Sequence, residues 1–155
     1  MEMLNKKDLK KLIKKGVEIS NPDHVVISSD SIISSGVKIG EFVEICGKSI
    51  IEQGAEILSF STINNSKIGK QTIVKKSEII DSEIGENCAI GPFAHIKQNS
   101  KLGNNLRIGN FVEIKNSIIK NGTKCAHLSY IGDAIVGERV NFGCGVVIAN
   151  YNGKQ

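Results

Sequence analysis

An isoleucine at every sixth position is the feature that most limits how this chain can fold. The series consists of Ile27, Ile33, Ile39, Ile45, Ile51, Ile57 and Ile63. A period of six matches neither an α-helix, which repeats about every 3.6 residues, nor a simple strand, which repeats about every 2. It matches a short strand followed by a corner, three of which complete one turn of a parallel β-helix. The spacing therefore predicts an all-β fold of hexapeptide repeats.

Small side chains and the later part of the repeat agree with this fold. Four residues after each of the first six isoleucines stands a small or β-branched residue: Ser31, Val37, Val43, Ser49, Ala55 and Ser61. The aliphatic position then continues to Ile148, with occasional steps of five residues. At about 18 residues per coil, the chain from Ile27 onward has room for about seven coils. A sandwich of short strands is the alternative, but its turns would be less regularly spaced.

Composition narrows the classes of function. The chain has 155 residues, 40% hydrophobic but only 5% aromatic, which suits one domain with a narrow aliphatic interior. Residues 1–16 contain six lysines and two acidic residues and so carry a net charge of +4. This is the net charge of the whole chain, so residues 17–155 have no net charge. A basic field of the kind that binds nucleic acid is therefore absent from the body, and we expect no nucleic-acid partner.

Residues 1–16 predict a short α-helix before the β-helix of residues 17–155. Asn5 is a plausible N-cap, and Gly16 is placed to end the helix. The apolar stripe consists of Leu9, Leu12 and Ile13. We interpret the segment as a capping or linker helix whose lysines face water. Binding to a membrane surface or an anionic polymer is the alternative.

The four cysteines lack the CxxC spacing of a metal or redox site. They are Cys46, Cys88, Cys125 and Cys144, and the repeat places Cys88 and Cys125 in the interior. Free thiols favour a reducing compartment, and the sequence holds neither a secretion signal nor a stretch able to cross a bilayer. We expect a cytoplasmic protein without membrane insertion.

Two lysines in the second half recur at the same place in successive coils. Lys97 follows the core residue Ile96, and Lys115 follows Ile114 one coil later. Neighbouring strands lie about 5 Å apart, so the two ammonium groups repel each other unless an anion lies between them. Phosphate is the natural candidate, because lysine binds it as a point charge. Two solvated surface lysines are the alternative.

A histidine lies in a second column of this half. His127 stands two residues after the core position Cys125, and the repeat aligns it with Asn110 and Cys144. A histidine can act as a general base because its pKa lies near the working pH, although a structural histidine is the alternative. Two further polar residues directly precede core positions, namely Tyr130 and Asn141.

Four ordered motifs resemble one known family. They are GPFAHIK at 91–97, GNFVEIKNS at 109–117, HLSYIGDA at 127–134 and NYNGK at 150–154. Together they resemble the acetyltransferase domain of bacterial bifunctional N-acetylglucosamine-1-phosphate uridyltransferase/glucosamine-1-phosphate acetyltransferase, through nearly the whole chain. The resemblance implies a left-handed β-helix and a homotrimer with active sites between subunits. It also implies transfer of acetyl from acetyl-CoA to glucosamine 1-phosphate, a step in UDP-N-acetylglucosamine and peptidoglycan-precursor synthesis for the cell wall.

The resemblance also implies roles for single residues. His127 would be the general base that takes a proton from the sugar amine as the nitrogen attacks the thioester. The sugar-phosphate positions are Lys97, Lys115, Tyr130 and Asn141, and the acetyl-CoA positions are Cys144, Asn150 and Tyr151. No metal is implied for this domain. A covalent route through Cys125 or Cys144 is an alternative that the chemistry does not require.

Three residues depart from the family pattern. Lys97 stands where arginine is usual, so the bidentate guanidinium fork is lost. Cys144 stands where alanine is usual, and Asn152 stands where aspartate is usual. Relative to the family, the sequence also lacks the uridyltransferase domain and the coils expected after Gln155, which supply a lysine and much of the CoA pocket. We therefore expect this sequence to hold mainly the sugar-phosphate half of the site.

Two other functions stand beside the acetyltransferase. One is a non-catalytic module that trimerises or binds a sugar phosphate. The other is a γ-type carbonic anhydrase, which shares the β-helix but needs three zinc-binding histidines at an interface. The three histidines here, His24, His95 and His127, are not suitably clustered in the repeat.

Overall fold

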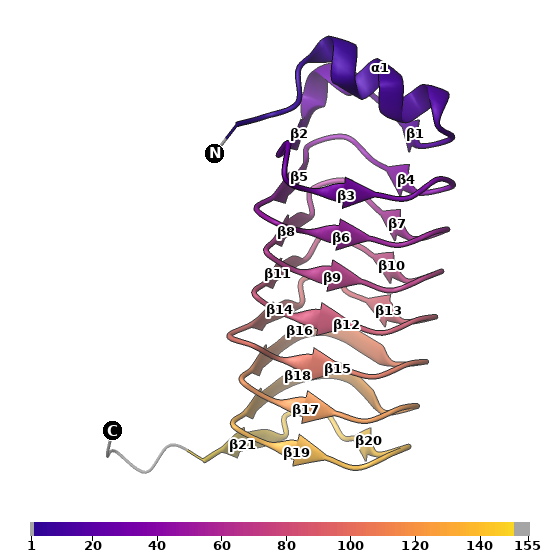
Figure 1. Ribbon diagram of the computed structural model, residues 1–155. Coiled ribbons are helices and arrows are strands. Elements are labelled where there is room, and N and C mark those ends of the chain that lie inside the picture. The colour runs from indigo at the N-terminus through magenta and orange to yellow at the C-terminus, as the bar shows by residue number, and fades with distance from the viewer. Residues whose placement is uncertain (1, 151–155) are drawn as a thin grey trace.

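The computed structural model describes residues 2–150 and shows them wound into one straight column of about eight coils (Figure 1). The coils are left-handed and all strand pairs between them are parallel, which confirms the predicted β-helix. Each coil contributes one short strand to each of three faces. The helix α1 lies across the N-terminal end of the column (Figure 1).

The strands of each face follow one another at intervals of one coil. The first face comprises β1 (Glu18–Ile19), β4 (Lys38–Ile39), β7 (Glu56–Ile57), β10 (Ile73–Val74), β13 (Ala89–Ile90), the first parts of β16 (Arg107–Lys115) and β18 (Lys124–Gly132), and β20 (Asn141–Phe142). The second face comprises β2 (Val25–Ile27), β5 (Val43–Cys46), β8 (Thr62–Asn64), β11 (Glu78–Ile80), β14 (His95–Lys97), the last parts of β16 and β18, and β21 (Val147–Ala149). The third face comprises β3 (Ile32–Ile33), β6 (Ile50–Ile51), β9 (Lys67–Ile68), β12 (Glu83–Ile84), β15 (Lys101–Leu102), β17 (Ile118–Ile119) and β19 (Ile135–Val136).

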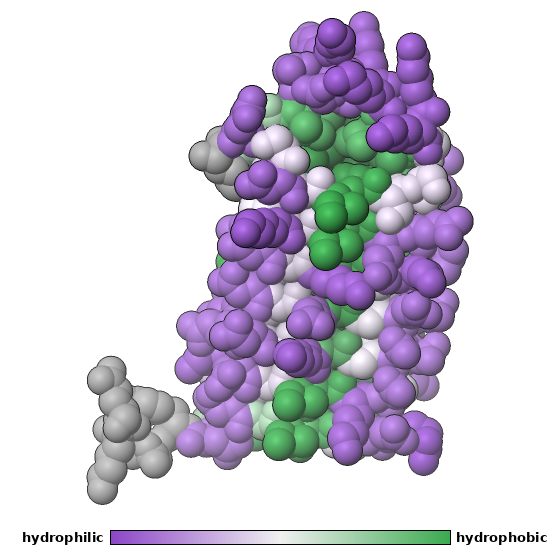
Figure 2. Space-filling view, viewed as in Figure 1, coloured by the Kyte–Doolittle hydropathy of each residue, from purple (hydrophilic) through white to green (hydrophobic). Residues whose placement is uncertain are grey.

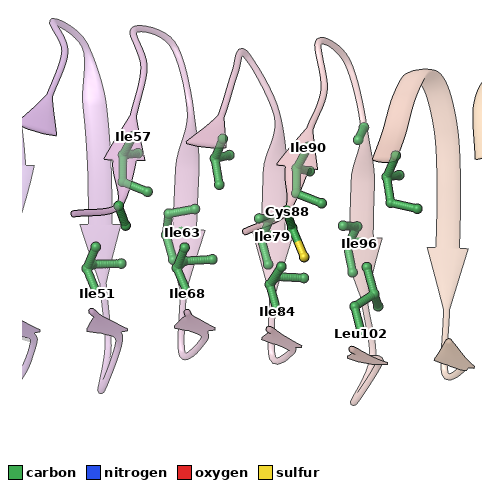
Figure 3. Packing of buried hydrophobic residues seen from close by; sticks show 14 of the residues in the cluster. Ile51, Ile57, Ile63, Ile68, Ile79, Ile84, Cys88, Ile90, Ile96 and Leu102 are labelled. Carbon is green, nitrogen blue, oxygen red and sulfur yellow. The ribbon is translucent and has the colours of Figure 1, made fainter. Parts of the chain in front are cut away.

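The interior is a stack of aliphatic side chains from the three faces (Figure 3). On the second face the core register runs through Ile63, Ile79, Ile96, Ile114, Ile131 and Ile148. Most of these isoleucines are fully buried. Burying one such side chain contributes about 1.5–3 kcal/mol, which explains why the period dictates the fold. Cys88 and Cys125 are also buried, as the repeat predicted.

Buried serines satisfy the backbone at the corner between the second and third faces. The column consists of Ser49, Ser66, Ser82, Ser100 and Ser117. Ser66 is typical, because its Oγ donates to the carbonyl of Asn64 at 2.7 Å and accepts from the backbone N–H of Ser82 at 3.1 Å. The serine Oγ atoms thus accept from corner N–H groups that have no backbone acceptor, and they give the corner carbonyls a second donor. This explains why small polar residues recur between the isoleucines.

The N-terminal helix α1 (Lys6–Lys14) begins and ends where the sequence predicts. The Asn5 side chain accepts from the N–H groups of Lys7 and Asp8, at 2.9 and 3.2 Å. The chain leaves the helix at Gly16, whose φ of +92° favours glycine. A 3₁₀ turn, η1 (Pro22–His24), follows β1. Within the described part of the chain, no helix is long and apolar enough to cross a membrane.

The outward side of the third face is apolar near both ends of the column and charged between them. Its register column consists of Ile32, Ile50, Lys67, Glu83, Lys101, Ile118 and Ile135. Figure 2 shows hydrophobic side chains towards both ends of this side and hydrophilic side chains between them. None of the predicted site residues belongs to this column.

Candidate functional site

Three neighbouring strands of the second face present a polar surface. Because side chains alternate along a strand, the residues on either side of each core isoleucine face outward. These residues are His95 and Lys97 on β14, Glu113 and Lys115 on β16, and Tyr130 and Gly132 on β18. We call these six residues the lysine face. Lys97 pairs in register with Lys115, so the predicted lysine column exists.

Both lysines are paired with carboxylates from the next coil. Lys97 Nζ lies 2.8 Å from Glu113 Oε1, and Lys115 Nζ lies 3.8 Å from Asp133 Oδ2. Both pairs are half-buried. Two closely spaced ammonium groups need nearby anions, and the protein itself supplies one carboxylate for each lysine. Glu113 and Asp133 were missed, although the alternation of acidic and basic residues in EIK is a visible signal for the first.

Asp133 connects the lysine face to a predicted acetyl-CoA position. Its Oδ1 accepts from Asn116 Nδ2 at 2.7 Å, and its backbone N–H donates to the carbonyl of Lys115 at 3.0 Å. Its own carbonyl accepts from Asn150 Nδ2, also at 3.0 Å. Its φ of +52° places it in the left-handed region, which aspartate tolerates better than most residues. Asp133 therefore holds three successive coils in register at this corner.

Two side chains complete the surface around the lysines. His95 Nε2 lies 3.2 Å from Glu78 Oε2 of the preceding coil, but the two atoms are not aligned for a hydrogen bond. The ring of Tyr130 lies over Gly132, since a Cβ at Gly132 would be 2.6 Å from the Cε1 and Oη atoms of Tyr130. The position of Tyr130 thus depends on glycine at 132.

His127 lies on the first face, on the other side of a corner. It pairs in register with Asn110, as predicted, and its side chain is exposed. The chain turns at Leu128, whose φ is +40°, before it reaches Tyr130. The buried Ser129 Oγ donates to the carbonyl of His127 at 2.8 Å and fixes this turn. Within residues 2–150, no hydrogen bond or ion pair orients the imidazole.

The remaining predicted residues divide between these regions. Asn141 begins β20 and pairs with Lys124, so it shares the first face with His127. Cys144 is exposed, and the adjacent Gly145 donates its N–H to the carbonyl of Leu128 at 3.0 Å, which places Cys144 near the corner. Asn150 lies at the corner beyond β21, and Tyr151 lies outside the described residues.

The structure therefore brings the predicted residues together in two groups. Lys97, Lys115 and Tyr130 face outward from the second face, whereas His127 and Asn141 face outward from the first. One chain does not present both groups on a single surface.

A row of exposed side chains follows the corner between these two groups. We call it the corner ladder, and it consists of His24, Phe42, Phe60, Lys76, Phe93, Phe111 and Leu128. The rings of Phe42 and Phe60 stack at 5.2 Å between centroids, as do those of Phe93 and Phe111. All four phenylalanines have positive φ and remain about half exposed. The hexapeptide pattern marks inward positions and so did not predict these outward rings, although the one-coil spacing of the phenylalanines is visible in the sequence.

Burial argues against a covalent route through Cys125. Cys125 is fully buried, and burial raises the pKa of its thiol. The thiolate is the nucleophilic form, so this cysteine is unreactive at neutral pH. Within residues 2–150, no three His, Cys, Asp or Glu side chains are placed to hold a metal ion.

One surface groove beside the third face has a volume of about 460 Å³ and is lined by residues that include Asn65, Asp81 and Asn99. Neither His127 nor the lysine face lines it.

The chain is similar in sequence to one family model and to curated proteins from several bacteria. A family model described as the GMPPB C-terminal domain matches residues 79–152. Bifunctional protein GlmU of Clostridioides difficile (strain 630) is 46% identical over 140 residues, which covers 90% of this chain and 30% of that protein. Bifunctional protein GlmU of Clostridium acetobutylicum is 44% identical over 154 residues, 99% of this chain and 34% of that protein. The chain thus spans about a third of the length of the curated relatives it matches.

A solved structure shares the fold. The H141N mutant of perosamine N-acetyltransferase from Caulobacter crescentus, in complex with CoA and GDP-perosamine, superposes with a TM-score of 0.59. It is 15% identical, and the match covers 61% of this chain and 47% of that chain. At this identity the likeness concerns the fold alone. The high identity to the curated relatives confirms the resemblance found in the motifs: this chain is a homologue of the left-handed β-helical acetyltransferase part of bacterial bifunctional GlmU proteins.

Proposed function

We propose that this chain acetylates the amine of glucosamine 1-phosphate with acetyl-CoA and so serves UDP-N-acetylglucosamine synthesis. The observation that carries the proposal is the register of Lys97 with Lys115 beside Tyr130. Two cations and a phenol on adjacent strands suit a phosphate group. The relationship to GlmU proteins supports the choice of an amino-sugar phosphate and of acetyl-CoA.

The proposed chemistry needs one base and an oriented amine. His127 takes a proton from the amine as the nitrogen attacks the thioester carbonyl, and the carbon–sulfur bond breaks to release CoA. Lys97, Lys115 and Tyr130 hold the sugar phosphate, and Asn141 contributes from the first face. Holding both reactants in this geometry supplies the proximity part of the rate enhancement. Cys144, Asn150 and Tyr151 are the proposed acetyl-CoA contacts.

We further propose that the site forms between copies in a homotrimer. His127 and the lysines face outward from two faces, so the lysine face of one copy has to meet His127 of its neighbour. The corner ladder supports such contact, because four half-exposed rings offer roughly 400 Å² of apolar surface at about 150–250 Å² per ring. In a closed ring of three copies, the same contact forms between each pair of neighbours, so no copy leaves its contact surface exposed.

One observation favours a second candidate function. No group among the described residues orients the imidazole of His127, whereas a general base is usually held by a third group. A module that trimerises or binds sugar phosphate without turnover needs no such orientation. The lysine face would then bind the ligand, and His127 would be dispensable.

Release of CoA thiol in the presence of glucosamine 1-phosphate tests the proposal. The wild-type chain should release thiol at a rate that depends on both substrates. His127→Ala should lower kcat by about 10²–10⁴ with unchanged folding, because general-base catalysis contributes about that factor. Lys10→Ala is the control, since Lys10 is an exposed residue of α1 and belongs to neither the corner ladder nor the lysine face. A wild-type rate in His127→Ala refutes the base, and sugar-phosphate binding without thiol release favours the second candidate.

A further inference from the structure

We propose that the ion pair between Lys97 and Glu113 selects ligands that have a cation next to their phosphate, by exchanging partners with them. The inference rests on the proposed function, because it concerns how the lysine face tells an amino-sugar phosphate from other phosphates. Glu113 is the specificity-determining residue.

The two lysines of this face are paired in different ways. Lys97 Nζ and Glu113 Oε1 are 2.8 Å apart, which is a direct charge-assisted hydrogen bond. Lys115 Nζ and Asp133 Oδ2 are 3.8 Å apart, which is too long for a hydrogen bond. Asn116 also anchors the Asp133 carboxylate, at 2.7 Å. Lys115 can therefore bind an anion with its present pairing kept, whereas Lys97 has to leave Glu113 first.

The charges around the lysines decide what can replace that bond. Lys97 and Lys115 are matched by Glu113 and Asp133, and Glu78 adds a further carboxylate one coil away. A simple phosphate that takes Lys97 leaves Glu113 without a cation and next to a second anion. The Glu113 carboxylate and the neighbouring phosphate repel each other, so replacing Glu113 with a simple phosphate as the partner of Lys97 is unfavourable.

A ligand with both charges avoids this penalty. In glucosamine 1-phosphate the ammonium and phosphate groups stand on neighbouring carbons, so the ligand resembles an ion pair itself. Its phosphate can bind Lys97 and Lys115 while its ammonium group binds Glu113, and every charge keeps a partner. The bound ammonium group first loses one proton to solvent, and the neutral amine that results is the nucleophile from which His127 takes the second proton during attack.

The pair is suited to exchange because it is accessible. Lys97 and Glu113 are 27% and 40% exposed, and ion pairs at such positions are weakly held. Glu113 stays on the lysine face when the pair opens, since its register partners are His95 and Tyr130. Acetylation turns the ammonium into a neutral amide, so the product can no longer satisfy Glu113 and should leave.

Calorimetric titration without acetyl-CoA tests the inference on the full chain. Three probes are compared: glucosamine 1-phosphate, glucose 1-phosphate and N-acetylglucosamine 1-phosphate. The amino sugar should bind about tenfold more tightly than the other two, as expected for one charge-assisted contact. Glu113→Gln should bring the three affinities within about threefold, mainly by strengthening glucose 1-phosphate.

Glu56→Gln is the matched control. It removes a Lys–Glu pair of the same kind on the first face, where Lys38 Nζ and Glu56 Oε1 are 3.0 Å apart, and should leave the tenfold preference intact. Equal affinities in the wild-type chain, no binding of any probe, or a preference that persists in Glu113→Gln each overturn the inference. If Glu113→Gln does not fold, the wild-type comparison still decides. Preference without acetyl transfer refutes only the proposed function, and transfer without preference refutes only this inference.

Discussion

Replacing Gly132 with alanine should displace Tyr130 without unfolding the β-helix. A Cβ at this position would lie 2.6 Å from the Cε1 and Oη atoms of the ring and 2.8 Å from Cζ, well inside normal contact. These atoms end a flexible, half-exposed side chain, so the ring can swing outward and leave the backbone in place. If a quarter of a ring of about 150–250 Å² becomes exposed, the loss of stability is about 1 kcal/mol.

Gly109→Ala is the matched control from the neighbouring coil. Its Cβ would meet the backbone of Ala126, with the carbonyl carbon at 2.9 Å and Cα at 3.0 Å, and neither atom can move without separating the coils. We expect a loss of at least about 3 kcal/mol, at the upper end of overpacking effects.

Urea unfolding followed by circular dichroism measures both changes, and calorimetric titration measures binding of glucosamine 1-phosphate. Gly132→Ala should weaken binding about tenfold while it keeps most of the stability, because Tyr130 no longer lies beside Lys115. The reasoning is refuted if both variants lose equal stability. It is also refuted if Gly132→Ala binds the sugar phosphate as tightly as the wild-type chain.

The remaining predictions concern the scaffold and the cysteines. Ile96→Ala should lower the free energy of unfolding, measured in urea, by about 2–5 kcal/mol, because the side chain is fully buried. A loss below about 1 kcal/mol would contradict the position of Ile96 in a tightly packed core. Ser117→Ala should cost about 1–3 kcal/mol in the same assay, since the half-buried N–H of Ala134 loses its acceptor, and an unchanged midpoint would disprove this. At neutral pH a thiol reagent should label the exposed Cys144 quickly, but Cys88 and Cys125 only after unfolding, because burial raises the pKa of both thiols. Since the folded state holds these protons more tightly, stability should be constant below the ordinary thiol value of 9.0 and fall above it, which melting curves from pH 7 to 10 would check.

The fold could be predicted from the sequence because one physical demand repeats at a fixed interval. Each isoleucine from Ile27 to Ile63 has to point into a narrow interior, and only a β-helix satisfies a six-residue spacing. Counting along the repeat, with its five-residue steps included, put Lys97 in register with Lys115 and His127 with Asn110. Positions that depend on coil length alone were therefore accessible without a structure.

Features that depend on where the chain turns were not accessible. The corner at Leu128 separates His127 from Tyr130 on two faces, although only two residues lie between them. The carboxylate partners of the lysines depend on side-chain conformation across coils, which periodicity does not specify. The exposed rings of the corner ladder were missed because an inward-looking pattern assigns aromatic residues no place.

Mixing two inactive variants tests the central claim, that His127 and the lysine face of different copies act on one substrate. His127→Ala and Lys115→Ala chains are unfolded together, refolded, and assayed for CoA release with glucosamine 1-phosphate. Each variant alone should be nearly inactive, but an equal mixture should recover about a quarter of the wild-type rate, since a quarter of the shared sites would hold both intact groups. A mixture as inactive as its components, under conditions where the refolded wild-type chain is active, would contradict the account.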